Sequence, residues 1–121
     1  MDRVFFAAGC LSGLLAVAAG AFGAHGLRAR LDPALLEVWK TAANYQLIHA
    51  LALVAVAWAA QRFPQGTWQP AGWCFLAGTL LFCGSLYGLS ALGWRFLGPI
   101  TPLGGLAFLA GWALLAWAAI K

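Results

Sequence analysis

The sequence predicts an all-α integral membrane protein, an antiparallel four-helix bundle with a short amphipathic interfacial helix between the first two helices. The first observation is composition: 64% of the 121 residues are hydrophobic and only 8% are charged, whereas about a quarter of the residues in soluble domains are charged. The second is length, because a helix needs about 20 residues to cross a bilayer, so the chain has room for four crossings and no soluble domain. The third is that the connections are short, which forces neighbouring helices to run antiparallel. We therefore expect residues 1–121 to form a single transmembrane domain.

The first predicted crossing covers about residues 4–24 and carries small residues at four-residue spacing. Gly9, Gly13 and Gly20 share a helical face with two alanines, a pattern that lets two helices approach closely. A secretory signal peptide is the alternative, because small residues near the end of the segment resemble a cleavage region. We expect the segment to be retained, since Asp2 is acidic and the apolar run exceeds the roughly 7 to 15 residues usual in a signal.

The connection after this crossing is polar and contains a helix-start signal. Asp32 is suited to cap free backbone N–H groups, and Pro33 is tolerated in a first helical turn. The alternation of apolar and charged residues that follows predicts an amphipathic interfacial helix over about 33–40. Trp39 is expected at the level of the lipid head groups. The second crossing then covers about residues 39–60.

Two further crossings follow short turns. The third covers about residues 70–92, after a turn with Pro64 and Gly66. The fourth covers about residues 102–120 and starts at Pro102, a residue suited to the first turn of a helix. The glycines on these two crossings that we expect to allow close helix packing are Gly84, Gly88, Gly104 and Gly105.

Polar side chains are predicted to gather in one half of the bundle. The start of the first crossing and the end of the fourth define face A, and the connections after the first and third crossings define face B. On the second crossing Thr41, Tyr45 and His49 share a stripe at helical spacing, and further polar groups of the other segments lie in the half near face B. The candidate polar cluster comprises His25, Lys40, Thr41, Asn44, Tyr45, Gln46, His49, Ser85, Tyr87, Ser90 and Thr101.

Several roles of this cluster stay open at this point. Polar side chains inside a membrane are costly unless they have partners, and hydrogen bonds between them join membrane helices at about 0.6 to 2 kcal/mol each. Alternatively, they form a small pocket or a proton-responsive site in which His49 is the titratable group. A haem held by His25 and His49 is a third interpretation, weakened by their different expected depths.

The sequence carries no visible catalytic, metal or nucleic-acid-binding constellation. No acidic residue lies within a predicted crossing, which argues against a catalytic triad and a carboxylate-driven transporter. Cys10, Cys74 and Cys83 have neither a disulfide nor a metal-binding spacing, so we interpret them as small buried apolar residues. We expect no enzyme activity, no cofactor, no metal and no nucleic-acid partner.

The formal net charge of +4 comes from residues near the helix ends, which is typical of membrane orientation and head-group contact. Face B has one cation more than face A, which favours a cytoplasmic face B. The cations compared are Arg28, Arg30, Lys40 and Arg95 at face B with Arg3, Arg62 and Lys121 at face A.

A set of motifs, taken together and in order, resembles a known family. The motifs are GAFGAHGL at 20–27, W-x-T-A-x-x-Y-Q-x-x-H-A at 39–50, G-S-L-Y at 84–87, T-P-x-G-G at 101–105 and GW at 111–112. In this combination the chain resembles the YgdD/YwdK-type small membrane proteins, an uncharacterised bacterial family with mitochondrial relatives. The resemblance covers nearly the whole chain and implies a four-helix inner-membrane protein, without a reaction, a cofactor or an established site.

The leading functional hypothesis is a small structural or accessory subunit of the cell inner (plasma) membrane, surrounded by membrane lipid. It would form a homo-oligomer or pack in a larger membrane complex through the glycine faces of the first and third crossings. The alternative is a module that binds or transports a small molecule, a lipid or a quinone in a polar pocket near face B.

Overall fold

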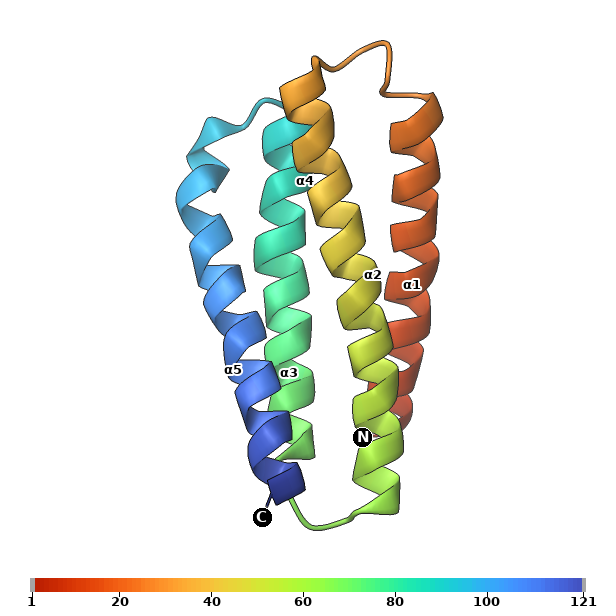
Figure 1. Ribbon diagram of the computed structural model, residues 1–121, viewed down its shortest axis with the longest axis vertical. Coiled ribbons are helices and arrows are strands. Elements are labelled where there is room, and N and C mark those ends of the chain that lie inside the picture. Colours follow the sequence, from red (N-terminus) through yellow and green to blue (C-terminus); the bar gives the residue numbers. More distant parts are fainter. Residues whose placement is uncertain (1, 121) are drawn as a thin grey trace.

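The computed structural model describes residues 2–120 as a bundle of long helices without strands in that range (Figure 1). Its elements are α1 (Asp2–His25), α2 (Pro33–Arg62), α3 (Trp68–Gly78), the π-helical turn η1 (Thr79–Cys83), α4 (Gly84–Ala91), the 3₁₀ turn η2 (Arg95–Ile100) and α5 (Thr101–Ile120). Lys121, which the charge comparison assigned to face A, lies outside the described residues.

Four stretches are long and apolar enough to cross a membrane, which confirms the predicted fold class. They are Arg3–His25, Pro33–Arg62, Trp68–Ala91 and Arg95–Ile120. Successive stretches run antiparallel, so α1 starts and α5 ends at the same end of the bundle, face A, at the bottom of Figure 1. α1 and α5 occupy opposite edges of that view. α1 packs chiefly on α2, and α5 packs chiefly on α3.

The separate interfacial helix predicted at 33–40 is not present, because these residues form the first turns of α2. The side chain of Asp32 caps α2 by accepting a hydrogen bond from the backbone N–H of Leu35 at 3.0 Å, and Pro33 occupies the first turn. No glycine or proline follows until Pro64, so nothing breaks the helix where it enters the apolar region. α2 therefore runs unbroken for 30 residues, which corresponds to about 45 Å.

The third crossing contains a π-helical turn that the sequence did not indicate. η1 joins α3 to α4 without ending the helix, and the hydroxyl of Thr79 donates to the carbonyl of Phe75 at 2.8 Å. Turns of this kind are rare and recur at functional sites. Here the turn lies against α5, because Gly104 packs directly on the backbone of Phe82.

Some of the glycines expected to allow close packing do so. A Cβ atom at Gly9 would lie 2.8 Å from the carbonyl oxygen of Ala50 on α2. A Cβ at Gly88 would overlap the side chain of Leu97 in η2, and one at Gly104 would overlap the backbone of Phe82. These positions bring α1 to α2, α4 to η2 and α5 to η1.

The remaining predicted glycines do not make close contacts. A Cβ at Gly13 or Gly105 would reach ordinary contact distances of 3.7 and 3.9 Å, and one at Gly20 or Gly84 would meet nothing within 4 Å. The prediction of close packing within the bundle is therefore wrong for Gly20 and Gly84. Beside Gly84 the space is open because this residue lines a groove between α1 and the η1–α4 segment.

Candidate functional site

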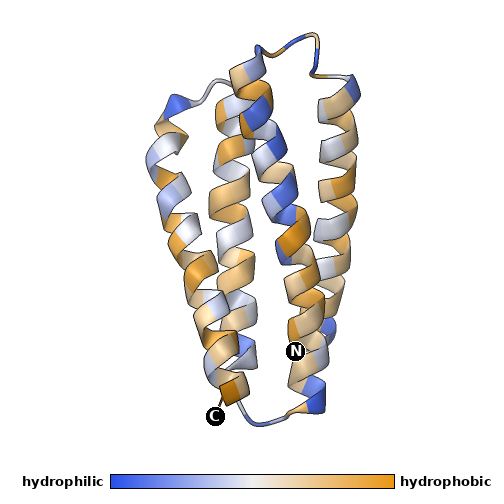
Figure 2. Ribbon diagram, in the orientation of Figure 1, coloured by the Kyte–Doolittle hydropathy of each residue, from blue (hydrophilic) through white to orange (hydrophobic). Residues whose placement is uncertain are grey.

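Apart from Gln61 and Arg62 in its last turn, the polar residues of α2 lie in its half near face B, where Figure 2 shows most of the hydrophilic colour of this helix. They do not converge on one point. Gln46 faces α1 and α4, whereas His49 faces α5. The candidate cluster is therefore divided between two sides of α2.

Gln46 joins three helices through its amide. The phenolic O–H of Tyr87 on α4 donates to Oε1 of Gln46 at 2.6 Å. Nε2 of Gln46 donates to the carbonyl oxygen of Ser12 on α1 at 3.2 Å, and lies 3.3 Å from the hydroxyl oxygen of the same residue. Gln46 is buried, with 7% of its surface exposed. Its amide therefore needs partners within the protein in place of water, and these hydrogen bonds supply them.

Trp39 supports the same region from the face B side. Its indole N–H donates to the carbonyl oxygen of Ala19 on α1 at 2.8 Å, and its ring centre lies 4.6 Å from that of Tyr87. A Cβ at Gly23 would lie 2.6 Å from the Trp39 ring, so this glycine makes room for the indole. Trp39 is thus packed between helices in addition to lying near the end of the bundle.

A groove opens beside this network, between α1 and the η1–α4 segment. We call it the α1–α4 groove; its volume is about 350 Å³. Its surface is mostly apolar, and the polar side chains in its lining include those of Trp39, Gln46 and Tyr87. The lining residues are Leu15, Ala19, Trp39, Gln46, Thr79, Leu80, Cys83, Gly84 and Tyr87.

His49 is held on the other side of α2 with both ring nitrogens occupied. The indole N–H of Trp112 on α5 donates to Nε2 at 3.1 Å, and because an indole nitrogen can only donate, Nε2 must accept. The ring proton is then on Nδ1, which lies 2.7 Å from the carbonyl oxygen of Tyr45 and donates to it. This network assigns the neutral Nδ1–H tautomer.

The ring of His49 also stacks on an aromatic side chain of α5. Its centre lies 3.6 Å from that of Phe108, with 10° between the planes, and only 3% of the residue is exposed. With both nitrogens bonded, the ring has no free lone pair for a haem iron or another metal. His25 is exposed at the end of α1, so the structure does not bring the two histidines together.

Other members of the candidate cluster make local contacts. Ser85 links α4 to α5 through a hydrogen bond with the hydroxyl of Thr101, and Ser90 bonds to the carbonyl of Leu86 in its own helix at 2.7 Å. On α2, Thr41 donates to the carbonyl of Glu37 at 2.9 Å. Lys40 forms an exposed ion pair with Glu37 at 3.7 Å, and Asn44 is exposed. Lys40, Thr41 and Asn44 therefore lie apart from the two buried networks.

Sequence reasoning missed three residues of these networks: Ser12, Phe108 and Trp112. The expected depth of Trp112 in the membrane could have indicated that it lies near His49. It lies ten residues into the fourth crossing, counted from Pro102, and His49 lies ten residues beyond Trp39, so both were expected about 15 Å from face B. Ser12 contributes mainly a backbone carbonyl and Phe108 is apolar, so neither carried a comparable signal.

Comparison with known proteins places the chain in a family. A family described as "Protein of unknown function (DUF423)" matches residues 19–105. The chain belongs to the DUF423 family. The DUF423 match includes Trp39, Gln46, His49 and Tyr87 and ends before Trp112.

Curated relatives extend the similarity over nearly the whole chain. A Bacillus subtilis protein named UPF0382 membrane protein YwdK is 46% identical over 98% of both chains. A Staphylococcus haemolyticus protein named UPF0382 membrane protein SH2409 is 40% identical, covering 98% of this chain and 97% of its own. A fission yeast relative, UPF0382 membrane protein C1782.12c of Schizosaccharomyces pombe, is 43% identical, covering 87% of this chain and 92% of its own. No solved structure matches.

These relatives confirm the resemblance to YwdK-type proteins that the motifs indicated. DUF423 proteins are membrane proteins of an uncharacterised family, and the fungal relative shows that the family extends beyond bacteria. The names of these relatives assign no molecular activity. A function for this DUF423 protein must therefore be argued from the geometry of its helices.

Removing the Tyr87 hydroxyl should weaken the Gln46 network. We expect Tyr87→Phe to lower the free energy of unfolding by about 0.6 to 1.7 kcal/mol, the range of interhelical hydrogen bonds in membranes, because Oε1 of Gln46 loses its donor. Unfolding in a fixed detergent, followed by circular dichroism, measures the change. Tyr45→Phe is the matched control, since the side chain of Tyr45 is 42% exposed. Equal losses in the two variants would contradict the assigned bond.

Proposed function

We propose that the protein is a small structural or accessory subunit of the cell inner (plasma) membrane, which associates with a second copy of itself or packs in a larger membrane complex. The observation that carries this proposal is that, among the described side chains, no buried polar atom lacks a hydrogen-bond partner. Polar groups that already join helices are poor candidates for acid–base chemistry or ligand binding. On this proposal the chain has no catalytic role and no cofactor.

The helical architecture supports the inner membrane as the location. Every described crossing is helical, whereas proteins of bacterial outer membranes are typically β-barrels. Bacterial relatives are named membrane proteins, which agrees with this assignment.

The α1–α4 groove supports association with another helix. Ala19 and Gly84 leave their positions in its wall free of large side chains, and a Cβ at Gly84 would meet nothing within 4 Å. Small residues at a helix surface let a second helix approach closely, which is how membrane helices associate. No helix of the bundle packs closely on Gly84, so a helix of a partner could do so in this groove.

Photocrosslinking inside the membrane tests the proposal. A photoreactive residue replaces Leu80, which lines the groove and is 75% exposed, and a control replaces Leu51, which is 66% exposed on α2. We expect a defined protein adduct, with a second copy or a constant partner, from position 80 and not from position 51. Gly84→Leu should abolish this adduct without lowering the unfolding temperature, because a Cβ at this position meets no atom within 4 Å and the longer side chain extends into the open groove. Lipid adducts alone, or an adduct unaffected by Gly84→Leu, would contradict the proposal.

A second candidate function is binding of a small molecule, a lipid or a quinone in the same groove. Its volume of about 350 Å³ lies at the lower end of the range for ligand pockets, and the rings of Trp39 and Tyr87 offer stacking surfaces. This function predicts an extra non-protein mass on the purified protein in native mass spectrometry. The mass should be lost in Gly84→Leu, and position 80 should then give no protein adduct.

A further inference from the structure

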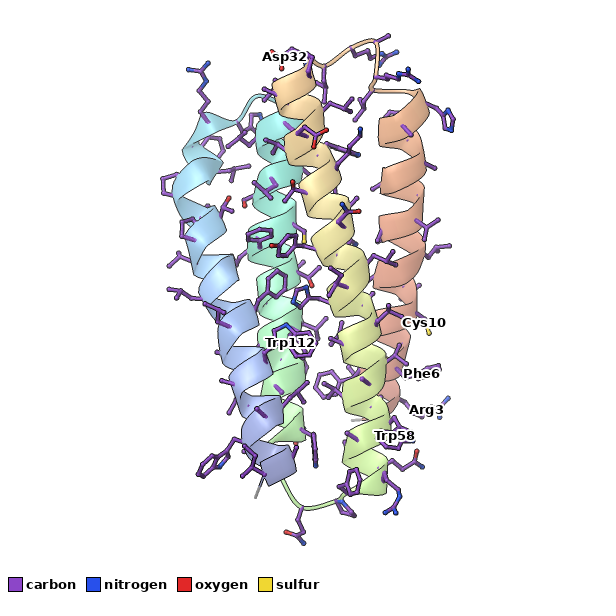
Figure 3. The ribbon with its side chains drawn as sticks, in the orientation of Figure 1. Arg3, Phe6, Cys10, Asp32, Trp58 and Trp112 are labelled. Carbon is purple, nitrogen blue, oxygen red and sulfur yellow. The ribbon has the colours of Figure 1, made fainter. Side chains whose placement is uncertain are left out.

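A second groove lies at face A, on the opposite half of the molecule from the polar cluster. We call it the face A groove. It runs between α1 and α2, and its volume of about 620 Å³ exceeds that of the α1–α4 groove. Figure 3 shows Arg3, Phe6 and Trp58 on the same side of the bundle, near the start of α1. The lining residues are Arg3, Phe6, Ala7, Val54, Ala57, Trp58 and Gln61.

The groove is polar at one end and apolar along the rest of its length. Arg3 lies in the first turn of α1 and Gln61 in the last turn of α2, so both are at the end of the bundle where the lipid head groups begin. Ala7 and Val54 lie about 6 and 10 Å deeper, at 1.5 Å per residue. The polarity thus changes along the helix axis in the same direction as in one leaflet of a bilayer.

The charge at this end favours an anion. Of the three acidic residues of the sequence, Asp32 and Glu37 lie near face B, and Asp2 begins α1 at face A. Against this one carboxylate, face A carries Arg3 in the groove and Arg62 in the last turn of α2. An arginine guanidinium matches the geometry of phosphate oxygens and can bind two of them at once.

The aromatic walls suit the boundary between head group and acyl chain. Phe6 is 53% exposed and Trp58 is 61% exposed, so both rings present large surfaces to whatever fills the groove. Tryptophan is enriched at this level because its ring is apolar while its N–H can contact polar groups. A second copy of this chain would place another cationic face A beside Arg3 if the two copies were parallel, whereas an anionic lipid complements it.

We propose that the face A groove binds one phospholipid with an anionic head group. Its phosphate lies against Arg3 and Gln61, and one acyl chain lies between Phe6 and Trp58 and reaches toward Ala7 and Val54. This site is independent of the α1–α4 groove and of the proposed association with a partner.

Native mass spectrometry of the whole chain in a mild detergent tests this site. The protein is mixed with equal amounts of phosphatidylglycerol and phosphatidylcholine that have identical acyl chains. We expect the first bound lipid to be phosphatidylglycerol about fivefold more often, the factor expected for one arginine near an anionic head group. Arg3→Gln should bring the ratio close to one. Arg95→Gln, which removes a cation at face B, is the matched control and should keep the preference.

A second variant tests the apolar part of the groove. Ala7 is exposed, so Ala7→Leu fills the groove without entering the core, and the unfolding temperature should be unchanged. We expect it to reduce binding of both lipids while the ratio between them persists. Equal binding of the two lipids by the unmodified protein, or equal effects of Arg3→Gln and Arg95→Gln, would overturn the proposal. So would lipid binding that Ala7→Leu leaves unchanged, or a protein dimer that this variant dissociates without any lipid preference.

Discussion

Gly104→Ala is expected to lower the free energy of unfolding by about 3 kcal/mol, at the upper end of the range for overpacked positions. The added Cβ would overlap the backbone nitrogen and Cα of Phe82 in η1. A side chain could rotate away from such an overlap, but a backbone can yield only if α5 and the third crossing move apart. That movement would also stretch the Ser85–Thr101 hydrogen bond, which joins α4 to the start of α5.

The neighbouring glycine provides the control. A Cβ at Gly105 would lie 3.9 Å from the Phe82 side chain, an ordinary contact distance, so Gly105→Ala should change the free energy of unfolding by less than about 0.5 kcal/mol. Both substitutions add the same methyl group to the same helical turn, so the difference between them isolates the packing of α5 on η1. Denaturant unfolding in one detergent, followed by circular dichroism, measures both. Similar values for the two variants would show that α5 does not approach η1 as described.

The membrane fold was predictable because it depends on the lengths of apolar segments, which a sequence displays directly. The error at 33–40 has a physical reason. An amphipathic pattern at the start of a helix is compatible with two structures: a separate helix on the membrane surface, or the first turns of a helix that continues into the membrane. Only the absence of a glycine or proline between Pro33 and the apolar run favoured continuation.

The π-helical turn could not be predicted, and it limits any argument from periodicity. A count at 100° per residue assumes an unbroken α-helix, and η1 changes the register of the residues that follow it. Gly84, the first residue after η1, was expected to pack in the bundle and lies at the open α1–α4 groove instead. Whether a glycine allows close helix packing or lies beside an open space depends on the position of the neighbouring helix, and the sequence of one helix does not reveal that position.

The candidate site was predicted in its location and not in its connections. Gln46 and His49 were placed in the same half of the second crossing, and the structure has both there, yet they contact different helices because they point to different sides of α2. Tyr87 was placed in the same half of the bundle, and its hydroxyl bonds to Gln46. Partners across a bundle depend on how the helices are arranged around α2, and periodicity within α2 does not determine that arrangement.

His49→Leu is expected to lower the free energy of unfolding by about 2 kcal/mol. It removes the interhelical hydrogen bond with Trp112, about 0.6 to 1.7 kcal/mol in membrane proteins, the bond to the carbonyl of Tyr45 in the same helix, and the stacking of the ring on Phe108. Leucine retains much of the buried apolar contact, which offsets part of this loss. His49→Gln should cost less, because an amide can keep one of the two bonds.

A double-mutant cycle with Trp112 separates this structural role from a proton-linked or ligand-binding role. Trp112→Phe alone should cost about 1 kcal/mol, because Nε2 of His49 loses the N–H that donates to it at 3.1 Å. In the His49→Leu background the same substitution should cost much less, because no acceptor remains for the indole to bond. The two effects are therefore non-additive, as expected for residues in direct contact.

Two other outcomes would contradict this structural role. If His49 served only to carry a proton or a ligand, the single variants would keep the stability of the parent protein. If the Trp112 bond were absent, the two losses of stability would add. Denaturant unfolding of the parent, both single variants and the double variant in one detergent distinguishes these outcomes, since coupling between His49 and Trp112 is expected only where each residue satisfies the other.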